Sequence, residues 1–438
     1  MRQERLNVFS PEIFLPLFVS IFYLAGLVLV DFSLRALAAV LAGIITYLAV
    51  THLTGVYIRG RDNGEGSYQA DYFERLLLSL LIIFIVDLAL KGFVPIQVRV
   101  PFYLATILTI FYFLGREKVK LSGPHYLTLG LLMILIYIMP SFVLYGLYGT
   151  YLNRTGGLMP AFLVGMGTIV TVYGLMKIAS GLTASRLFMM IGLISAIIGP
   201  LMAATIGYRA YAIIYIMPLI FQYYLERRPP IDFRAGLKAA GVIILISLYT
   251  YLATSVARGV IYTAAPLESP RAPAYVVESM EKGGYTHSDM MQGTKVITRP
   301  FFTYKVFLEV VDKSFPWGTS HGRLTLSLMP GVNLGRATTI DILGKPFSTS
   351  FFGLSFLEFG FLGIVFFASI LGLCLATASR LKDVKVYSII LTTVILWLDT
   401  GPSVWWHWLP FVSATITFTA ILFDNLVKPK ITGSKYWF

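Results

Sequence analysis

Runs of about 20 apolar residues recur along most of this chain and constrain its fold more than any other feature. Wound as an α-helix, such a run crosses the roughly 30 Å hydrocarbon core of a bilayer. The chain is 57% hydrophobic and 13% charged, which is too apolar for a soluble protein of 438 residues. We therefore predict an all-α polytopic membrane protein with about twelve transmembrane helices, near residues 11–30, 33–54, 73–93, 98–114, 126–149, 158–176, 186–205, 208–225, 235–256, 352–378, 386–400 and 406–425.

One long segment, residues 257–351, interrupts the apolar pattern. It contains ten basic and seven acidic residues and many prolines and glycines. Lipid-exposed irregular backbone does not occur in hydrocarbon, so the segment must lie in water or cover a water-filled cavity. Its aromatic residues, including Phe307 and Trp317, favour an ordered structure. We expect three parts: nine helices in 1–256, a cap loop with short helices in 257–351, and three helices with a cytoplasmic tail in 352–438.

The distribution of lysine and arginine predicts the orientation. If the N-terminus is cytoplasmic, the inner segments hold twenty basic residues and the short outer loops hold five. The positive-inside rule then predicts that both termini are cytoplasmic and that the cap is extracytoplasmic. The net charge of +13 is thereby explained, and no nucleic-acid partner is expected. The basic start, residues 1–7, lacks a following cleavage site and is typical of a retained signal anchor.

Common catalytic motifs are missing from the sequence. It has no phosphate-cradling P-loop, no His-Glu-x-x-His zinc site and no Gly-x-Ser-x-Gly nucleophile elbow. The first outer loop has Asp31 but no paired aspartate, and the chain has a single cysteine, Cys374. Any chemistry must therefore come from arginines, a few acids and two histidines on the outer side. We predict neither a metal nor a cofactor.

Arginines are the candidate ligands for an anionic substrate. Arg209 ends a short outer loop with no neighbouring acid. Guanidinium groups bind phosphoryl oxygens bidentately, so Arg209 is a candidate ligand for a phosphate or diphosphate. The alternative is an arginine that only touches lipid headgroups, and each cap arginine taken alone could simply be solvated. The cap adds four further candidates for the diphosphate: Arg258, Arg299, Arg323 and Arg336.

Glu358 is the candidate acid within apolar sequence. Intramembrane carboxyl groups are energetically costly and usually mark functional sites. Nearby glycines would let its helix pack closely or break near the outer end. Two cap histidines, His321 and His287, are alternative proton acceptors, although a lone loop histidine is usually only solvated. Three tryptophans at 405, 406 and 408 are most simply an interfacial belt, and Asp399 and His407 beside them are less favoured site residues.

These features together resemble the family of O-antigen polymerases, also called oligosaccharide repeat-unit polymerases. The similarity comprises the Gly207-Tyr-Arg209 turn entering a helix, the long late outer loop, and the Ser/Thr-rich entry to a helix that carries Gly353, Glu358, Gly360 and Gly363. The resemblance implies a glycosyltransferase of GT-C architecture with its site at the outer membrane face. It also implies metal-independent transfer of a glycan from a polyprenyl-diphosphate carrier to another lipid-linked repeat unit.

The resemblance implies several partners and leaves two alternatives open. The partners would be polyprenyl-diphosphate-linked oligosaccharides, membrane lipids, and the flippase and chain-length regulator proteins of the same process. One alternative is an O-antigen ligase-type transferase with another acceptor. The other is a flippase or exporter of lipid-linked oligosaccharide, although such transporters often show paired halves and this sequence shows no convincing repeat.

Overall fold

A computed structural model describes residues 9–59, 68–90, 105, 121–153, 158–181, 190–195, 197–199, 210–227, 295–322, 350–380, 383–400 and 405–427. The regular elements in these ranges are all helical, which confirms the all-α prediction for this part of the chain. They are α1 Pro11–Leu29, α2 Leu34–Arg59, α3 Tyr68–Leu90, α5 Gly123–Asn153, α6 Leu158–Ser180, α8 Ala210–Arg227, α12 Lys295–Ser314, α15 Phe351–Arg380, α16 Val384–Thr400, the 3₁₀ helix η1 Trp405–Trp408 and α17 Leu409–Val427.

Several of the observed helices coincide with expected spans to within a few residues. Four of them are long and apolar enough to cross a bilayer: Pro11–Val28, Leu34–Ile58, Leu163–Ser180 and Phe351–Arg380. Shorter apolar helices occupy five more expected spans, including Ile213–Glu226 and Val384–Trp397. The expected helices at 98–114 and 235–256 lie outside the described residues, apart from residue 105, so the total of twelve stays a prediction.

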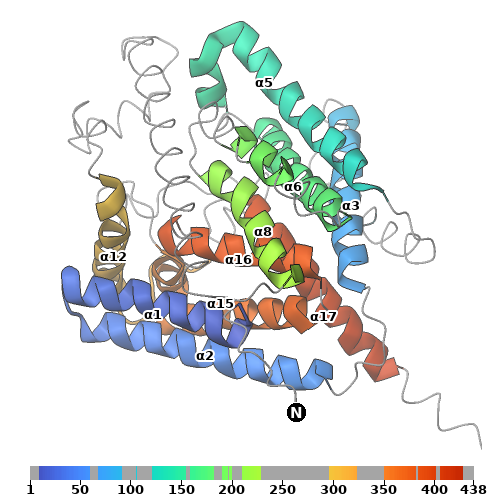
Figure 1. Cartoon of the computed structure of the whole chain (residues 1–438). Coiled ribbons are helices and arrows are strands. Elements are labelled where there is room, and N and C mark those ends of the chain that lie inside the picture. The colour runs from blue at the N-terminus through green and yellow to red at the C-terminus, as the bar shows by residue number, and fades with distance from the viewer. Residues whose placement is uncertain are drawn as a thin grey trace, which may run out of the picture.

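Two groups of helices make up the described structure (Figure 1). The first group is the α1–α2 hairpin with α15 packed along α2, and the second contains α5 packed along α6. Helices α8 and α16 pack against each other and contribute to the core between these groups. Trp397 of α16 is almost fully buried in that core, where its ring stacks on Phe411 with centroids 4.5 Å apart.

Glycines allow the close approach of α5 and α6. Gly130 of α5 and Gly174 of α6 each lie so near the other helix that an added Cβ would come within 2.5 Å of a backbone nitrogen. Small residues at such contacts let helix backbones pack tightly within membranes, where association relies on van der Waals contact rather than on hydrophobic burial. The spacing of seven between Gly123 and Gly130, and between Gly167 and Gly174, keeps these glycines on one helix face.

Polar contacts gather helix ends at one end of the bundle. Arg380 at the end of α15 donates to Glu12 at the start of α1 at 2.7 Å. The hydroxyl of Tyr387, near the start of α16, donates to the carbonyl of Phe9 at 2.5 Å. The charge pattern assigns the start of α1, the end of α15 and the start of α16 to the same side of the membrane. The structure brings these three together. Which side of the membrane they face stays a prediction.

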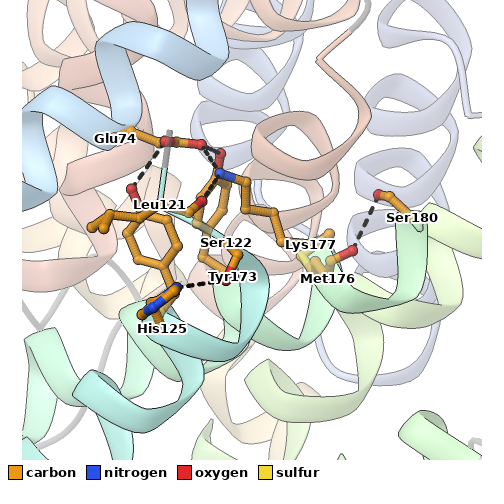
Figure 2. Close-up of polar contacts among 9 residues, drawn as sticks. Glu74, Leu121, Ser122, His125, Tyr173, Met176, Lys177 and Ser180 are labelled. Atoms are coloured by element: carbon orange, nitrogen blue, oxygen red, sulfur yellow. Dashed lines mark hydrogen bonds and ion pairs between the residues drawn. The ribbon is translucent and has the colours of Figure 1, made fainter. Parts of the chain in front are cut away.

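A charged network ties α3, α5 and α6 together (Figure 2). The ammonium of Lys177 lies 2.6 Å from Oε1 of Glu74 and also donates to the Leu121 carbonyl at 2.6 Å. Tyr173 donates to Glu74 Oε1 at 2.9 Å and Tyr126 donates to Oε2 at 3.0 Å. Because the carboxylate is largely buried and receives donors from two other helices, the network fixes how these helices meet.

Replacing Lys177 with methionine is expected to destabilise the protein by about 3 kcal/mol, because Glu74 would stay largely buried without its cation. The measurement is the thermal unfolding midpoint of purified protein in detergent. The double variant Glu74→Gln/Lys177→Met should recover much of the loss, since it also removes the uncompensated charge. If the single and double variants are destabilised equally, the loss of stability does not come from leaving the Glu74 charge without its partner.

Helix α12 is amphipathic and crosses the end of the α1–α2 hairpin (Figure 1). Over residues 303–314 its exposed face carries Lys305, Glu309, Asp312 and Lys313, at helical spacing, and the remaining side chains are buried and mostly apolar. Tyr304 packs where Gly26 of α1 leaves room, and its hydroxyl donates to the Asp31 carbonyl at 3.2 Å. This helix lies within the segment predicted as the cap.

Candidate functional site

Helix α15 is broken near its first third, as its glycines suggested. Phe359 has φ −143° and ψ 25°, and Gly360 has φ 60° and ψ −135°. The conformation of Gly360 is accessible to glycine and strained for residues with a Cβ. An added Cβ would also lie 1.8 Å from the carbonyl oxygen of Pro316. Glycine is therefore required here by both conformation and space.

The turn that follows α12 fills the break. The N–H groups of Thr319 and Ser320 donate to the Leu357 carbonyl at 2.8 and 2.9 Å, and that of His321 donates to the Glu358 carbonyl at 2.9 Å. A helix that ends leaves its last carbonyl groups without intrahelical partners. The turn supplies such partners, so the cap and α15 are joined by backbone hydrogen bonds and not only by side-chain packing.

The carboxyl group of Glu358 lies at this junction. Its side chain is fully buried, and the N–H of Gly322 donates to its Oε2. A hydrogen bond from a backbone donor to a carboxylate is strong and directional. The turn therefore holds the orientation of the acid that the sequence singled out.

His321 is brought to the same junction. It has φ 44°, an uncommon conformation for a residue other than glycine, although histidine is among those that adopt it most often. Its side chain is exposed, and its ring lies 6.4 Å from that of Phe359. Strained backbone of this kind is concentrated at functional sites. Two of the three candidate proton acceptors, Glu358 of α15 and His321 of the turn, thus lie at one junction.

Arg35, at the start of α2, is one of the five basic residues assigned above to short outer loops, and the structure places it near α12. Its guanidinium lies 4.6 Å from the ring of Phe315 and 3.9 Å from Asp312, and both ionic partners are more than half exposed. Exposed pairs of this length contribute little stability. Nothing in the sequence places residue 35 beside residue 312, so this cation could not be linked to the cap before the structure.

Tyr304, near the start of the described side chains of α12, has a neutral hydroxyl. Burial, and then the negative charge of Asp31, raise the pKa of Tyr304 to about 12. At neutral pH the phenol is therefore a hydrogen-bond donor and adds no negative charge to this face of α12.

The other predicted site residues lie outside the described part of the chain. These are His287, Arg209, Arg258, Arg323 and Arg336. Arg299 falls within α12, but its side chain is not among those described. Arg323 directly follows Gly322, whose N–H donates to Glu358. The diphosphate ligands therefore remain predictions.

Trp408, one of the three tryptophans of the predicted interfacial belt, is partly buried, and the belt itself stays a prediction. Its ring packs against Trp397, with centroids 4.6 Å apart, and against Phe367. His407 is fully buried, and Trp397 Nε1 donates to its Nδ1 at 3.3 Å. His407 therefore belongs to the core, and Trp408 packs against it. Asp399 belongs to α16, and its side chain is not among those described.

The model of the family described as "Putative O-antigen polymerase" matches residues 284–411. The resemblance to O-antigen polymerases is confirmed. No curated protein and no solved structure matches the chain. The O-antigen polymerase match contains α12, the turn, the broken helix α15 and α16. It also contains Glu358 and both candidate histidines, whereas Arg209 and Arg258 lie outside it.

Within the described ranges, no three histidine, cysteine or acidic side chains come together as a metal site. The junction contains one buried carboxyl group and one exposed imidazole, while the backbone N–H groups of the turn already donate to Leu357 and Glu358. Carboxylate and neutral imidazole groups are among the side chains that act as general bases, and that Glu358 or His321 does so here stays a prediction.

Proposed function

We propose that this protein polymerises polyprenyl-diphosphate-linked oligosaccharide repeat units into a surface polysaccharide at the outer face of the membrane. One observation supports this proposal most strongly. The residues matched by the O-antigen polymerase family contain Glu358, a buried acid at the break in α15 whose carboxyl group accepts a hydrogen bond from Gly322. The finer expectations belong to the same proposal: GT-C architecture, about twelve spans, cytoplasmic termini, and flippase and chain-length regulator partners.

In the proposed step, the hydroxyl oxygen of a lipid-linked acceptor attacks the anomeric carbon of the donor glycan. A new glycosidic C–O bond forms while the bond between that carbon and the diphosphate oxygen breaks, and the polyprenyl diphosphate leaves with the electron pair. The proton of the acceptor hydroxyl passes to Glu358. General base catalysis of this kind contributes about 10²- to 10⁴-fold to rate. His321, exposed at the same turn, is the second candidate for this role.

Arginines are proposed to stabilise the departing diphosphate, with Arg209 as the first ligand and cap arginines as the others. Arg209→Lys keeps the charge but loses the planar fork, so we expect it to lose most polymerisation, and Arg209→Ala nearly all. Chain formation by membranes containing each variant is the measurement. A lysine variant with normal activity would instead support an arginine that only touches lipid headgroups.

We further propose that the transfer needs no divalent metal, because arginines can stabilise the departing charge in place of a cation. Purified protein with lipid-linked repeat units should therefore keep its rate in excess EDTA. Activity that disappears with EDTA and returns with magnesium or manganese would contradict this mechanism. It would direct the search for ligands to Asp289, Asp341, Glu358 and Asp399.

Analysis of lipid-linked glycans in a deletion strain separates the three candidate functions. Loss of a polymerase leaves single repeat units on the lipid carrier at the outer face. Loss of a ligase leaves long chains on the carrier, and loss of a flippase leaves single units at the cytoplasmic face. We expect the first pattern. Either of the others would replace the polymerase assignment with the corresponding alternative.

A further inference from the structure

Part of the turn after α12, residues 318–322, fills the break in α15 with backbone donors. We call these residues the docked segment. The N–H groups of residues 319–321 donate to the carbonyl groups of Leu357 and Glu358. The next N–H, that of Gly322, donates to the Glu358 carboxylate. The break therefore contributes hydrogen-bond acceptors to this contact, and the docked segment contributes the donors.

Glu358 is shielded from solvent while the segment is docked. The residue is 0% exposed, and its Oε2 already accepts the hydrogen bond from Gly322. A general base must come within about 3 Å of the group whose proton it accepts, directly or through one water. A substrate hydroxyl can therefore reach this carboxylate only after the protein around it moves.

Side-chain packing holds the docked segment only lightly. Thr319 and His321 are exposed, and Ser320 is the buried side chain between them. Gly318 and Gly322, with φ of 77° and 90°, flank these three residues. Segments with few buried apolar contacts open locally at a lower cost than a packed core. The docked segment is thus the part of this junction best suited to move.

The groups that the segment covers select the chemistry of a ligand that replaces it. Carbonyl and carboxylate oxygens need donors, and a sugar has hydroxyl donors on neighbouring carbon atoms. The head group of a polyprenyl diphosphate has acceptor oxygens and negative charge, which the Glu358 carboxylate would repel. Its apolar chain has no donor at all. The break is therefore complementary to the glycan part of a lipid-linked substrate.

We propose that the break in α15 is the acceptor-sugar site, and that the docked segment occupies it until an acceptor displaces the segment. Sugar hydroxyl groups would then donate to the carbonyl groups of Leu357 and Glu358, and the reacting hydroxyl to the Glu358 carboxylate. The proposal rests on the proposed function, which supplies the glycan acceptor. Displacement leaves the break in place, whereas loss of the break itself would remove the site.

The first test follows the docked segment in the full-length wild-type protein without turnover. The probe is the repeat-unit oligosaccharide released by mild acid from the cell's own lipid-linked precursor. It lacks the diphosphate and cannot act as a donor. At millimolar concentration it should speed hydrogen–deuterium exchange of the amides of residues 319–322 by about tenfold or more. Polyprenyl diphosphate without a glycan should not change the exchange.

Two results of the exchange test would overturn the proposal. One is exchange that stays unchanged or becomes slower with the oligosaccharide, because the segment would then keep its place. The other is equal acceleration by the bare polyprenyl diphosphate, because the effect would then not come from the sugar.

A reversible tether tests whether the segment has to leave the break. Thr319 and Phe359 are exposed on the two sides of the contact. A Cβ added at Gly318 would lie 2.8 Å from the nitrogen of Gly360, so the Cα atoms of residues 319 and 359 are within about 11 Å of each other. A short bis-methanethiosulfonate should therefore bridge the pair in Thr319→Cys/Phe359→Cys. The native Cys374 is buried and should not react.

Bridging is expected to lower chain extension by about tenfold or more, and a reducing agent should restore it. The controls are the two single variants, Thr319→Cys and Phe359→Cys, treated with the same reagent. Each should keep its own untreated rate. If the double variant extends chains as fast after bridging as before, the segment does not need to leave and the proposal is wrong.

The exchange test needs no turnover, so the two proposals can fail separately. Oligosaccharide that displaces the segment in a protein that never extends a chain would refute the polymerase function and keep the sugar site. Normal chain extension by the bridged protein would refute displacement and keep the function.

Discussion

Replacing Glu358 with glutamine is expected to lower polymerisation by about 10²- to 10⁴-fold without unfolding the protein. Glutamine has nearly the same shape, and its carbonyl oxygen can still accept the hydrogen bond from the Gly322 N–H. It cannot take a proton from an acceptor hydroxyl. The measurement is the initial rate of chain extension by purified protein, with the thermal unfolding midpoint recorded alongside.

The matched control is Glu309→Gln, which makes the same chemical change on the exposed face of α12. It should leave both rate and stability unchanged. If Glu358→Gln retains its rate, Glu358 serves only to anchor the turn, and His321 becomes the candidate base. His321→Ala should then abolish the activity that Glu358→Gln keeps.

Gly360→Ala is expected to have the second large effect, through structure rather than chemistry. Its backbone conformation would cost a residue with a Cβ about 1 to 3 kcal/mol, and the new methyl group would overlap the Pro316 carbonyl. The turn should therefore leave the break in α15 and lose its hold on Glu358. We expect polymerisation to fall to near background, and the amides of Thr319, Ser320 and His321 to exchange with solvent much faster.

Gly192→Ala is the control for this substitution. Gly192 is helical, and an added Cβ would have no atom within 4 Å. Alanine there should be neutral or stabilise the protein by up to about 1 kcal/mol. Normal amide protection and normal activity in Gly360→Ala would show that the turn does not depend on this glycine.

The helices and the acid could be predicted because each depends on local sequence. Apolar runs placed α1, α2 and α15 within a few residues, and Glu358 was visible as a charge inside one of them. The glycines around it indicated a close contact or a break, and a break is what α15 has at Gly360.

The contacts that make the site could not be predicted, because they join residues far apart in sequence. The approach of Gly322 to Glu358 depends on how a turn docks on another helix, and the pairing of Arg35 with Asp312 depends on where α12 lies. Lys177 is one of the twenty basic residues that the charge count assigns to inner segments, and only the structure shows that it pairs with Glu74 of another helix. No periodicity within one segment carries such information.

The most direct test of the central claim is chain extension by the purified protein in liposomes supplied with polyprenyl-diphosphate-linked repeat units. The account predicts a ladder of lipid-linked products that differ by one repeat unit, formed without added protein partners and nearly absent with Glu358→Gln. Wild-type protein that leaves every repeat unit single, or that only moves the units across the bilayer, would contradict it.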